Sequence, residues 1–132
     1  MIRKIIHILG GGYNQLPIVN QAKSMGYEVL VTDMYENPPC RKVANYFEQI
    51  NTTDKEESLE AAKKYNVCAV ITDQTDVAVP TVAYIAEELG LEGIGYQTAL
   101  RFTNKYLLRE YLQDKAPESV PAHAYFLEPK SA

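Results

Sequence analysis

Three consecutive glycines, Gly10, Gly11 and Gly12, are the part of this 132-residue sequence with the clearest potential to bind a ligand. They follow the apolar run 5–9 and precede apolar residues at helical spacing, which predicts a buried strand, a tight turn and a helix start. Glycines let a ligand approach the backbone closely, and the N–H groups of a first helical turn favour negative charge. The turn is therefore a candidate anion or polar-ligand site, although a plain strand-to-helix connection has the same pattern.

Carboxylates follow two further apolar runs. Asp33 ends the run 29–33, and Asp73 and Asp76 follow the run 67–72. In an open parallel sheet, ligands bind beyond the carboxyl ends of the strands, so these groups are expected to share one cleft with the glycine turn. For Asp33 and Asp76, a loop or helix-capping carboxylate is the alternative. The residues predicted to bind a ligand in this cleft are Gly11, Gly12, Gln15, Asp33, Asp73 and Asp76.

The elements that position these residues alternate along the chain. Apolar runs predict strands at 5–9, 29–33, 46–50 and 67–72, and helical spacing predicts helices at about 16–25, 53–66 and 79–89. The second helix is expected to start with a capping box of Thr53 and Glu56. The alternation predicts an α/β fold, a Rossmann-like open parallel sheet with helices on both faces and right-handed crossovers.

Several side chains are assigned to the core or the surface from this pattern. Ile18, Ala22 and Met25 share one helical face, which is the expected core face of the first helix. The two cysteines have neither metal spacing nor the pattern of a disulfide framework. We expect Cys68 to be a small core residue and Cys40 an ordinary loop thiol.

The pattern changes after residue 91. A single helical turn is predicted at 99–102, a helix capped by Thr103 and Asn104 at 105–112, and an extended segment at 122–128. These features predict a Rossmann-like domain at 1–95, followed at 96–132 by a helical linker and the start of a truncated second domain. The ending favours an excised domain of a longer protein, and a genuine C-terminus is the alternative.

Composition excludes several classes of partner. The net charge of −4 and the absence of clustered Lys and Arg argue against nucleic acid as the main partner. No segment approaches the roughly 18 apolar residues of a membrane span, and the N-terminal apolar run is too short for a secretory signal, so the prediction is a cytoplasmic protein without membrane contact. His7 and His123 have no ligand-spaced companions, so no metal site is predicted. The oligomeric state, including a homodimer, is left open.

A dinucleotide site was the first alternative for the glycine turn. Asp33 follows Gly12 by 21 residues, the distance at which an acidic residue binds the ribose in Rossmann domains. However, the third glycine of that fingerprint would fall at Gln15. A bulky side chain there disfavours close packing of the helix beside a pyrophosphate.

The whole set of motifs resembles the N-terminal preATP-grasp domain of ATP-grasp ligases, and is similar to the large subunit of carbamoyl-phosphate synthetase and to related carboxylate-amine ligases. The resemblance covers almost the whole chain and depends on the order and spacing of its motifs. They are Ile8-Leu9-Gly10-Gly11-Gly12 with Gln15-Leu16, Gly26-Tyr27-Glu28-Val29 with Asp33, Val79-Pro80, Ile85-Ala86-Glu87-Glu88-Leu89-Gly90-Leu91, and Thr103-Asn104-Lys105 with Arg109.

The resemblance implies an ATP- and Mg-dependent reaction in the full-length enzyme, in which a carboxylate becomes an acyl phosphate that an amine or ammonia attacks. It places Gly11, Gly12, Gln15 and Asp33 in the acceptor-substrate cleft and Lys105 at the nucleotide phosphates, where a solvated surface lysine is the alternative. It implies that the chain supplies no catalytic residue, binds no cofactor tightly by itself, and acts with missing C-terminal ATP-grasp domains on a small-molecule carboxylate or amine.

Two other hypotheses remain open at this point. The chain is then either a free-standing nucleotide- or dinucleotide-binding Rossmann module, or a non-catalytic interaction domain that retained the fold.

Overall fold

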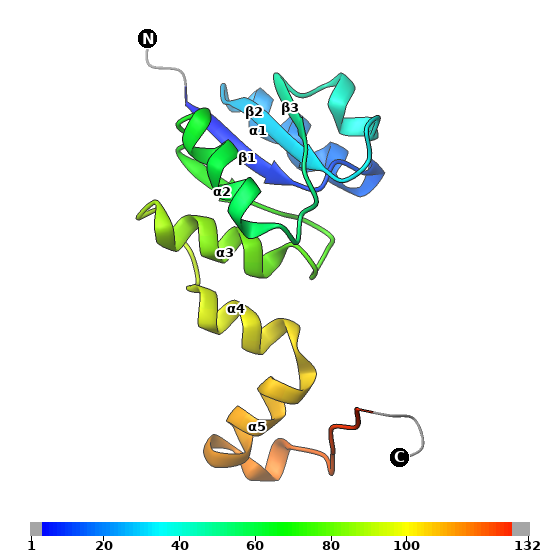
Figure 1. Cartoon of the computed structure of the whole chain (residues 1–132), viewed down its shortest axis with the longest axis vertical. Helices are drawn as coiled ribbons and strands as arrows, with labels where there is room; N and C mark the ends of the chain where they lie inside the picture. Colours follow the sequence, from blue (N-terminus) through cyan, green and yellow to red (C-terminus); the bar gives the residue numbers. More distant parts are fainter. Residues whose placement is uncertain (1–3, 128–132) are drawn as a thin grey trace.

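Four parallel strands form the centre of the computed structural model, which describes residues 4–127 (Figure 1). They are β1 (Ile5–Leu9), β2 (Glu28–Asp33), β3 (Tyr46–Gln49) and β4 (Ala69–Ile71), in the spatial order β3-β2-β1-β4. The two central strands are the most buried, and Ile8 of β1 is in register with Val31 of β2 and Ile71 of β4. The predicted parallel sheet is confirmed, with a third and a fourth strand shorter than expected.

Helices cover both faces of this sheet, as predicted. On one face, α1 (Leu16–Ser24) packs Val19 and Ala22 against β1 and β2. On the other face, α2 (Lys55–Lys64) and α3 (Val79–Glu88) bury Leu59 and Ile85 against Leu30 of β2. Burying apolar side chains on both faces explains why the central strands read as continuous apolar runs.

Three predictions about burial are wrong. Met25 is 64% exposed, because α1 ends at Ser24 and Val19 takes the core position. Cys68 is exposed, since it precedes the short strand β4 at the open edge of the sheet. Cys40 is fully buried, because the short 3-10 helix η2 (Pro39–Lys42) packs against the glycine turn.

The helix boundaries differ in detail from the prediction. The cap of α2 is Asp54, whose Oδ1 accepts a hydrogen bond from the Glu57 N–H at 3.0 Å, and not Thr53, whose hydroxyl bonds to Asn51 Oδ1 at 2.9 Å. The turn predicted at 99–102 is part of a longer helix, α4 (Tyr96–Thr103). Asn104 caps α5 (Lys105–Lys115) as predicted, and this helix extends one turn further than expected.

The chain leads away from the sheet after α3, because α4 packs on α3 and α5 packs on α4 (Figure 1). Beyond the short 3-10 helix η3 (Pro117–Ser119), residues 122–127 form no strand. This segment lies against α5, where the rings of Tyr106 and Tyr125 are 5.2 Å apart. Glu128, the last residue of the predicted extended segment, lies outside the described residues, and the boundary at residue 95 stays a prediction.

Ser58 of α2 offers a test of how buried polar groups affect this fold. Its side chain is fully buried, and its hydroxyl has no hydrogen-bond partner within residues 4–127. Because burying an unbonded hydroxyl is unfavourable, Ser58→Ala is expected to raise the free energy of unfolding by about 1 kcal/mol in denaturant titrations. Ser24→Ala, at an exposed site, is the control and should change it by less than about 0.5 kcal/mol. A loss of stability for Ser58→Ala would contradict this account.

Candidate active site

The glycine turn joins β1 to the short 3-10 helix η1 (Tyr13–Gln15), and each glycine has a separate function there. Gly10 has a φ of +93°, a backbone conformation that residues with a side chain rarely adopt, and its N–H donates to Thr32 O at 2.8 Å. The Gly11 N–H donates to Asp33 Oδ2 at 2.7 Å. The Gly12 N–H donates to Gln15 Oε1 at 3.0 Å. All three N–H groups of the turn are therefore hydrogen-bonded, that of Gly10 to a backbone carbonyl and those of Gly11 and Gly12 to side chains.

Asp33 lies at the end of β2, directly beside this turn. Its Oδ2 accepts the Gly11 N–H, and its Oδ1 accepts the Tyr35 N–H at 2.9 Å. Hydrogen bonds to an ionised carboxylate are stronger than neutral ones, so this side chain holds β1 and the segment after β2 together. Each carboxylate oxygen keeps a second lone pair for a ligand.

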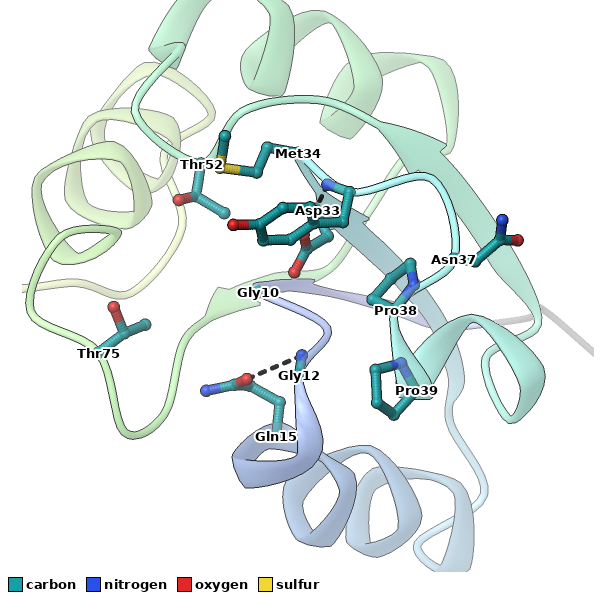
Figure 2. A pocket seen from close by; sticks show the side chains of 11 residues that line it. Gly10, Gly12, Gln15, Asp33, Met34, Asn37, Pro38, Pro39, Thr52 and Thr75 are labelled. Atoms are coloured by element: carbon teal, nitrogen blue, oxygen red, sulfur yellow. Dashed lines mark hydrogen bonds between the residues drawn. The ribbon is translucent and has the colours of Figure 1, made fainter.

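A pocket of about 530 Å³ opens beyond the carboxyl ends of β1 and β2. It lies between the glycine turn, the connection from β2 to η2, and the loop that carries Thr75 (Figure 2). Its lining combines glycine backbone, one carboxylate, amides, hydroxyls and apolar groups: Gly10, Gly12, Gln15, Asp33, Met34, Tyr35, Asn37, Pro38, Pro39, Thr52 and Thr75. This is the position at which open α/β sheets bind ligands.

The structure brings only part of the predicted cleft together. Gly12, Gln15 and Asp33 line the pocket, whereas Gly11 is buried behind Asp33. Asp73 and Asp76 line a neighbouring depression of about 360 Å³, which shares Thr75 with the first pocket. The Gln15 side-chain amide joins the two regions, because its Nε2 donates to Asp73 O. The binding roles of all six residues stay predictions.

The sequence prediction missed the wall of the pocket that follows β2. This wall includes Asn37, Pro38 and Pro39. They are held there by η2, since the Cys40 N–H donates to Gly11 O at 2.9 Å. A proline pair after a strand-end carboxylate indicates only a turn in the sequence, so this contact had no sequence signal.

Cys40 itself is part of the support of the turn. Its thiol donates to Gly12 O at 3.3 Å. Burial and, to a smaller extent, the charge of Asp33 raise the pKa of this thiol, which keeps it protonated and poorly reactive.

The other predicted ligand-binding residue, Lys105, lies elsewhere. It is the exposed first residue of α5, and it lines neither the pocket nor the neighbouring depression. Its role at nucleotide phosphates stays a prediction. Within the part of the chain that the structure describes, no group of three or more His, Cys, Asp or Glu side chains is placed to hold a metal ion, and no helix is long and apolar enough to cross a membrane.

The sequence of this chain is similar to the N-terminal parts of known enzymes. No protein-family model matches the chain. Two curated relatives align over most of it. A formate-dependent phosphoribosylglycinamide formyltransferase of Maridesulfovibrio salexigens is 32% identical over 86% of the chain, and an N5-carboxyaminoimidazole ribonucleotide synthase of Staphylococcus aureus is 29% identical over 88%. Both relatives are ATP-grasp ligases. The chain spans only 28% and 30% of their lengths, respectively.

Solved structures agree with these relatives on the fold. The phosphoribosylglycinamide synthetase of Anaerococcus prevotii superposes with a TM-score of 0.77 and 24% identity, over 86% of this chain and 29% of that one. This chain has the preATP-grasp fold. The N5-carboxyaminoimidazole synthetase of Staphylococcus aureus, solved in complex with ADP, superposes with a TM-score of 0.66 and 24% identity, over 86% and 30% of the two chains.

The resemblance to preATP-grasp domains predicted from the sequence is therefore confirmed, and so is the α/β fold class. In this preATP-grasp fold, the glycine turn, Asp33 and the segment 34–39 form a pocket that can bind and orient a small polar molecule. Its one carboxylate, Asp33, accepts hydrogen bonds from two backbone N–H groups.

Proposed function

We propose that this chain is the substrate-side domain of an ATP-dependent carboxylate-amine ligase that acts through an acyl phosphate. The observation that carries the proposal is the pocket at the carboxyl ends of β1 and β2, in a preATP-grasp fold whose relatives are ATP-grasp ligases. The fold alone does not determine the reaction, so the proposal depends on the pocket and the relatives together.

The residues of this chain indicate which substrates it binds and which an ATP-grasp domain binds. Its described residues include no cluster of acidic side chains that would hold Mg²⁺, and the Gly11 and Gly12 N–H groups are occupied. The glycine turn therefore has no free N–H donor at Gly11 or Gly12 for a nucleotide phosphate, and the predicted phosphate contact of Lys105 lies outside the pocket. We propose that an ATP-grasp domain, which makes up the remaining length in the relatives, holds both. This chain then binds and orients the second substrate.

The occupied N–H groups also bear on the alternative of a dinucleotide-binding module. A pyrophosphate bound at a glycine turn needs backbone N–H donors directed at it. Here it would have to displace Asp33 from Gly11 and Gln15 from Gly12. This requirement supports the ligase over the dinucleotide alternative.

The test is an ATP hydrolysis assay on the chain alone and on the chain combined with an ATP-grasp domain, joined to it or added in trans. The chain alone is expected to release no ADP, and the combination is expected to release ADP only when a carboxylate and an amine are both present. ATP hydrolysis by the chain alone would contradict the proposal. So would micromolar binding of NAD that Asp33→Ala weakens.

A further inference from the structure

We infer that Lys55 is a positioning residue, which holds the arm formed by α4 and α5 (residues 96–115) in one orientation to the sheet. The arm carries Lys105, whose predicted contact is a nucleotide phosphate, so Lys55 sets the position of that lysine relative to the pocket. This consequence rests on the proposed function, whereas the contacts of Lys55 with the arm do not. The inference is carried by the small buried surface of the arm and by two aromatic rings that bind the Lys55 ammonium.

The arm contributes little to a shared core. Among its described residues, Ala99 is buried in α4, and α5 buries none. Phe102 of α4 and Tyr111 of α5 are 68% and 43% exposed. Helices in proteins are stabilised mainly by packing of an apolar face, so this packing holds the arm only weakly. The orientation of the arm therefore depends on other contacts.

The connection from α3 to the arm does not fix the orientation. It covers residues 89–95 and contains Gly90, Gly93 and Gly95. Glycine adopts many backbone conformations, so this connection permits several directions of the helix that follows it. Glu87 of α3 accepts the Tyr96 N–H at 2.9 Å, and this hydrogen bond holds the start of α4. A contact from outside α3 is needed to fix the direction of the arm.

Lys55 provides such a contact from α2. Its Nζ lies over the Tyr84 ring of α3, 4.4 Å from the ring centre, and over the Tyr96 ring of α4, 4.9 Å from the ring centre. The two rings are 5.5 Å apart in an edge-to-face arrangement. An ammonium within about 6 Å of an aromatic ring centre is attracted by the negative face of the ring. One cation therefore joins α2, α3 and the first residue of the arm, and we call these three side chains the clamp.

The surroundings of the clamp favour this arrangement. Glu56 follows Lys55 on α2, and its two carboxylate oxygens accept the Tyr84 hydroxyl at 3.1 and 3.2 Å, which fixes the first ring. Lys55 is the first residue of α2, where the positive end of the helix dipole disfavours a cation. The two ring faces compensate this cost, because they attract the ammonium.

The clamp lies between the pocket and Lys105 along the chain. Thr52, which lines the pocket, shortly precedes Lys55, and Lys105 is the first residue of α5, directly after α4. The loop that forms one wall of the pocket therefore leads into the residue that holds the arm, which extends away from the sheet (Figure 1). In the proposed ligase, this path keeps the pocket and Lys105 in one geometry.

The test measures release of the arm by hydrogen exchange of the whole chain. The Ala99 amide donates to Gly95 O at 3.0 Å and reports the arm, whereas the Val31 amide reports the sheet. A helix of 8 residues is marginal in water without packing, so release of the arm speeds exchange in α4. Lys55→Met keeps the length of the side chain and removes its charge. It is expected to speed exchange at Ala99 about fivefold and to leave Val31 unchanged.

Further variants separate the cation from other effects. Lys55→Arg keeps a cation that can lie over the rings, so Ala99 is expected to exchange as in the parent. Lys63→Met removes a charge from the exposed part of α2, where the lysine pairs with Glu60, and should change neither amide. Tyr96→Leu removes the same contact from the other side, so combining it with Lys55→Met should add little to the effect of either alone.

A distance measurement tests the orientation of the arm directly. Cys68 is exposed beside β4, Cys40 is buried, and Gln113 is exposed on α5. Spin labels are therefore attached at Cys68 and at the variant position Gln113→Cys. Pulsed electron paramagnetic resonance is expected to give one narrow distance distribution for this protein, the same distribution after Lys55→Arg, and a broader one after Lys55→Met.

Each outcome of these experiments decides the inference. It is overturned if Lys55→Met leaves either the exchange at Ala99 or the distance distribution unchanged. It is also overturned if Ala99 and Val31 exchange faster by the same factor, because Lys55 then stabilises the whole fold, or if Lys55→Arg behaves like Lys55→Met. None of these measurements involves ATP, so a failure of the ATP hydrolysis assay overturns the proposed function and leaves the clamp standing.

Discussion

Lowering the pH from 7 to 4 is expected to reduce the free energy of unfolding by about 3 kcal/mol through His7 alone. The His7 side chain is fully buried in β1, and burial lowers its pKa from 6.5 to about 3. Its Nε2 is 2.9 Å from Thr32 Oγ1, and its Nδ1 has no partner among residues 4–127. A charged imidazole has nothing here to compensate its lost hydration, so the folded state keeps the ring neutral.

The direction of this effect follows from the protonation of His7 in the folded and in the unfolded chain. Above pH 6.5 the ring is neutral in the folded and the unfolded chain, so the full stability is present. Between pH 6.5 and about 3, the unfolded chain binds a proton that the folded chain does not, and stability is lost as the pH falls. Urea titrations at several pH values measure the loss.

The control for this prediction is His7→Gln, which keeps a polar group near Thr32 but does not titrate. The variant is expected to be less stable than the parent at pH 7, but to lose less stability between pH 6.5 and pH 4. An equal acid dependence of the two proteins would show that groups other than His7 account for the acid sensitivity.

The fold was predictable because its signals are local. Continuous apolar runs identify β1 and β2, whose residues are buried on both faces, and glycines mark the helix ends. Gly26 and Gly90 both have positive φ, as a residue that follows a helix often does. The errors lie where tertiary packing overrides local pattern: Cys40 is buried because η2 packs on the glycine turn, and Cys68 is exposed because β4 starts after it.

The candidate site was predictable only in part, for the same reason. Gly12, Gln15 and Asp33 follow strand ends, so the rule for parallel sheets places them at one edge. Thr52 and Thr75 reach the pocket from two other connections, and their positions depend on the paths of those loops. The hydrogen bond from Gln15 Nε2 to Asp73 O could not be predicted from the sequence either, because it joins residues 58 positions apart.

The second large effect is expected at Gly11, where the substitution Gly11→Ala should lower the free energy of unfolding by about 1–3 kcal/mol. An added Cβ would lie 3.0 Å from Val31 Cγ1 and 3.1 Å from Pro38 Cγ, in a fully packed environment. Either the Val31 side chain or the Pro38 ring must shift by a few tenths of an ångström to make room for it.

Gly26→Ala is the matched control, because it separates backbone conformation from packing. Gly26 has a φ of +86° but no atom within 4 Å of an added Cβ, so the substitution should cost about 1 kcal/mol through backbone strain alone. Urea unfolding of both variants gives the comparison. If Gly11→Ala kept the parent's free energy of unfolding, the packing of Val31 and Pro38 around Gly11 would accommodate the added Cβ without cost, and this prediction would be wrong.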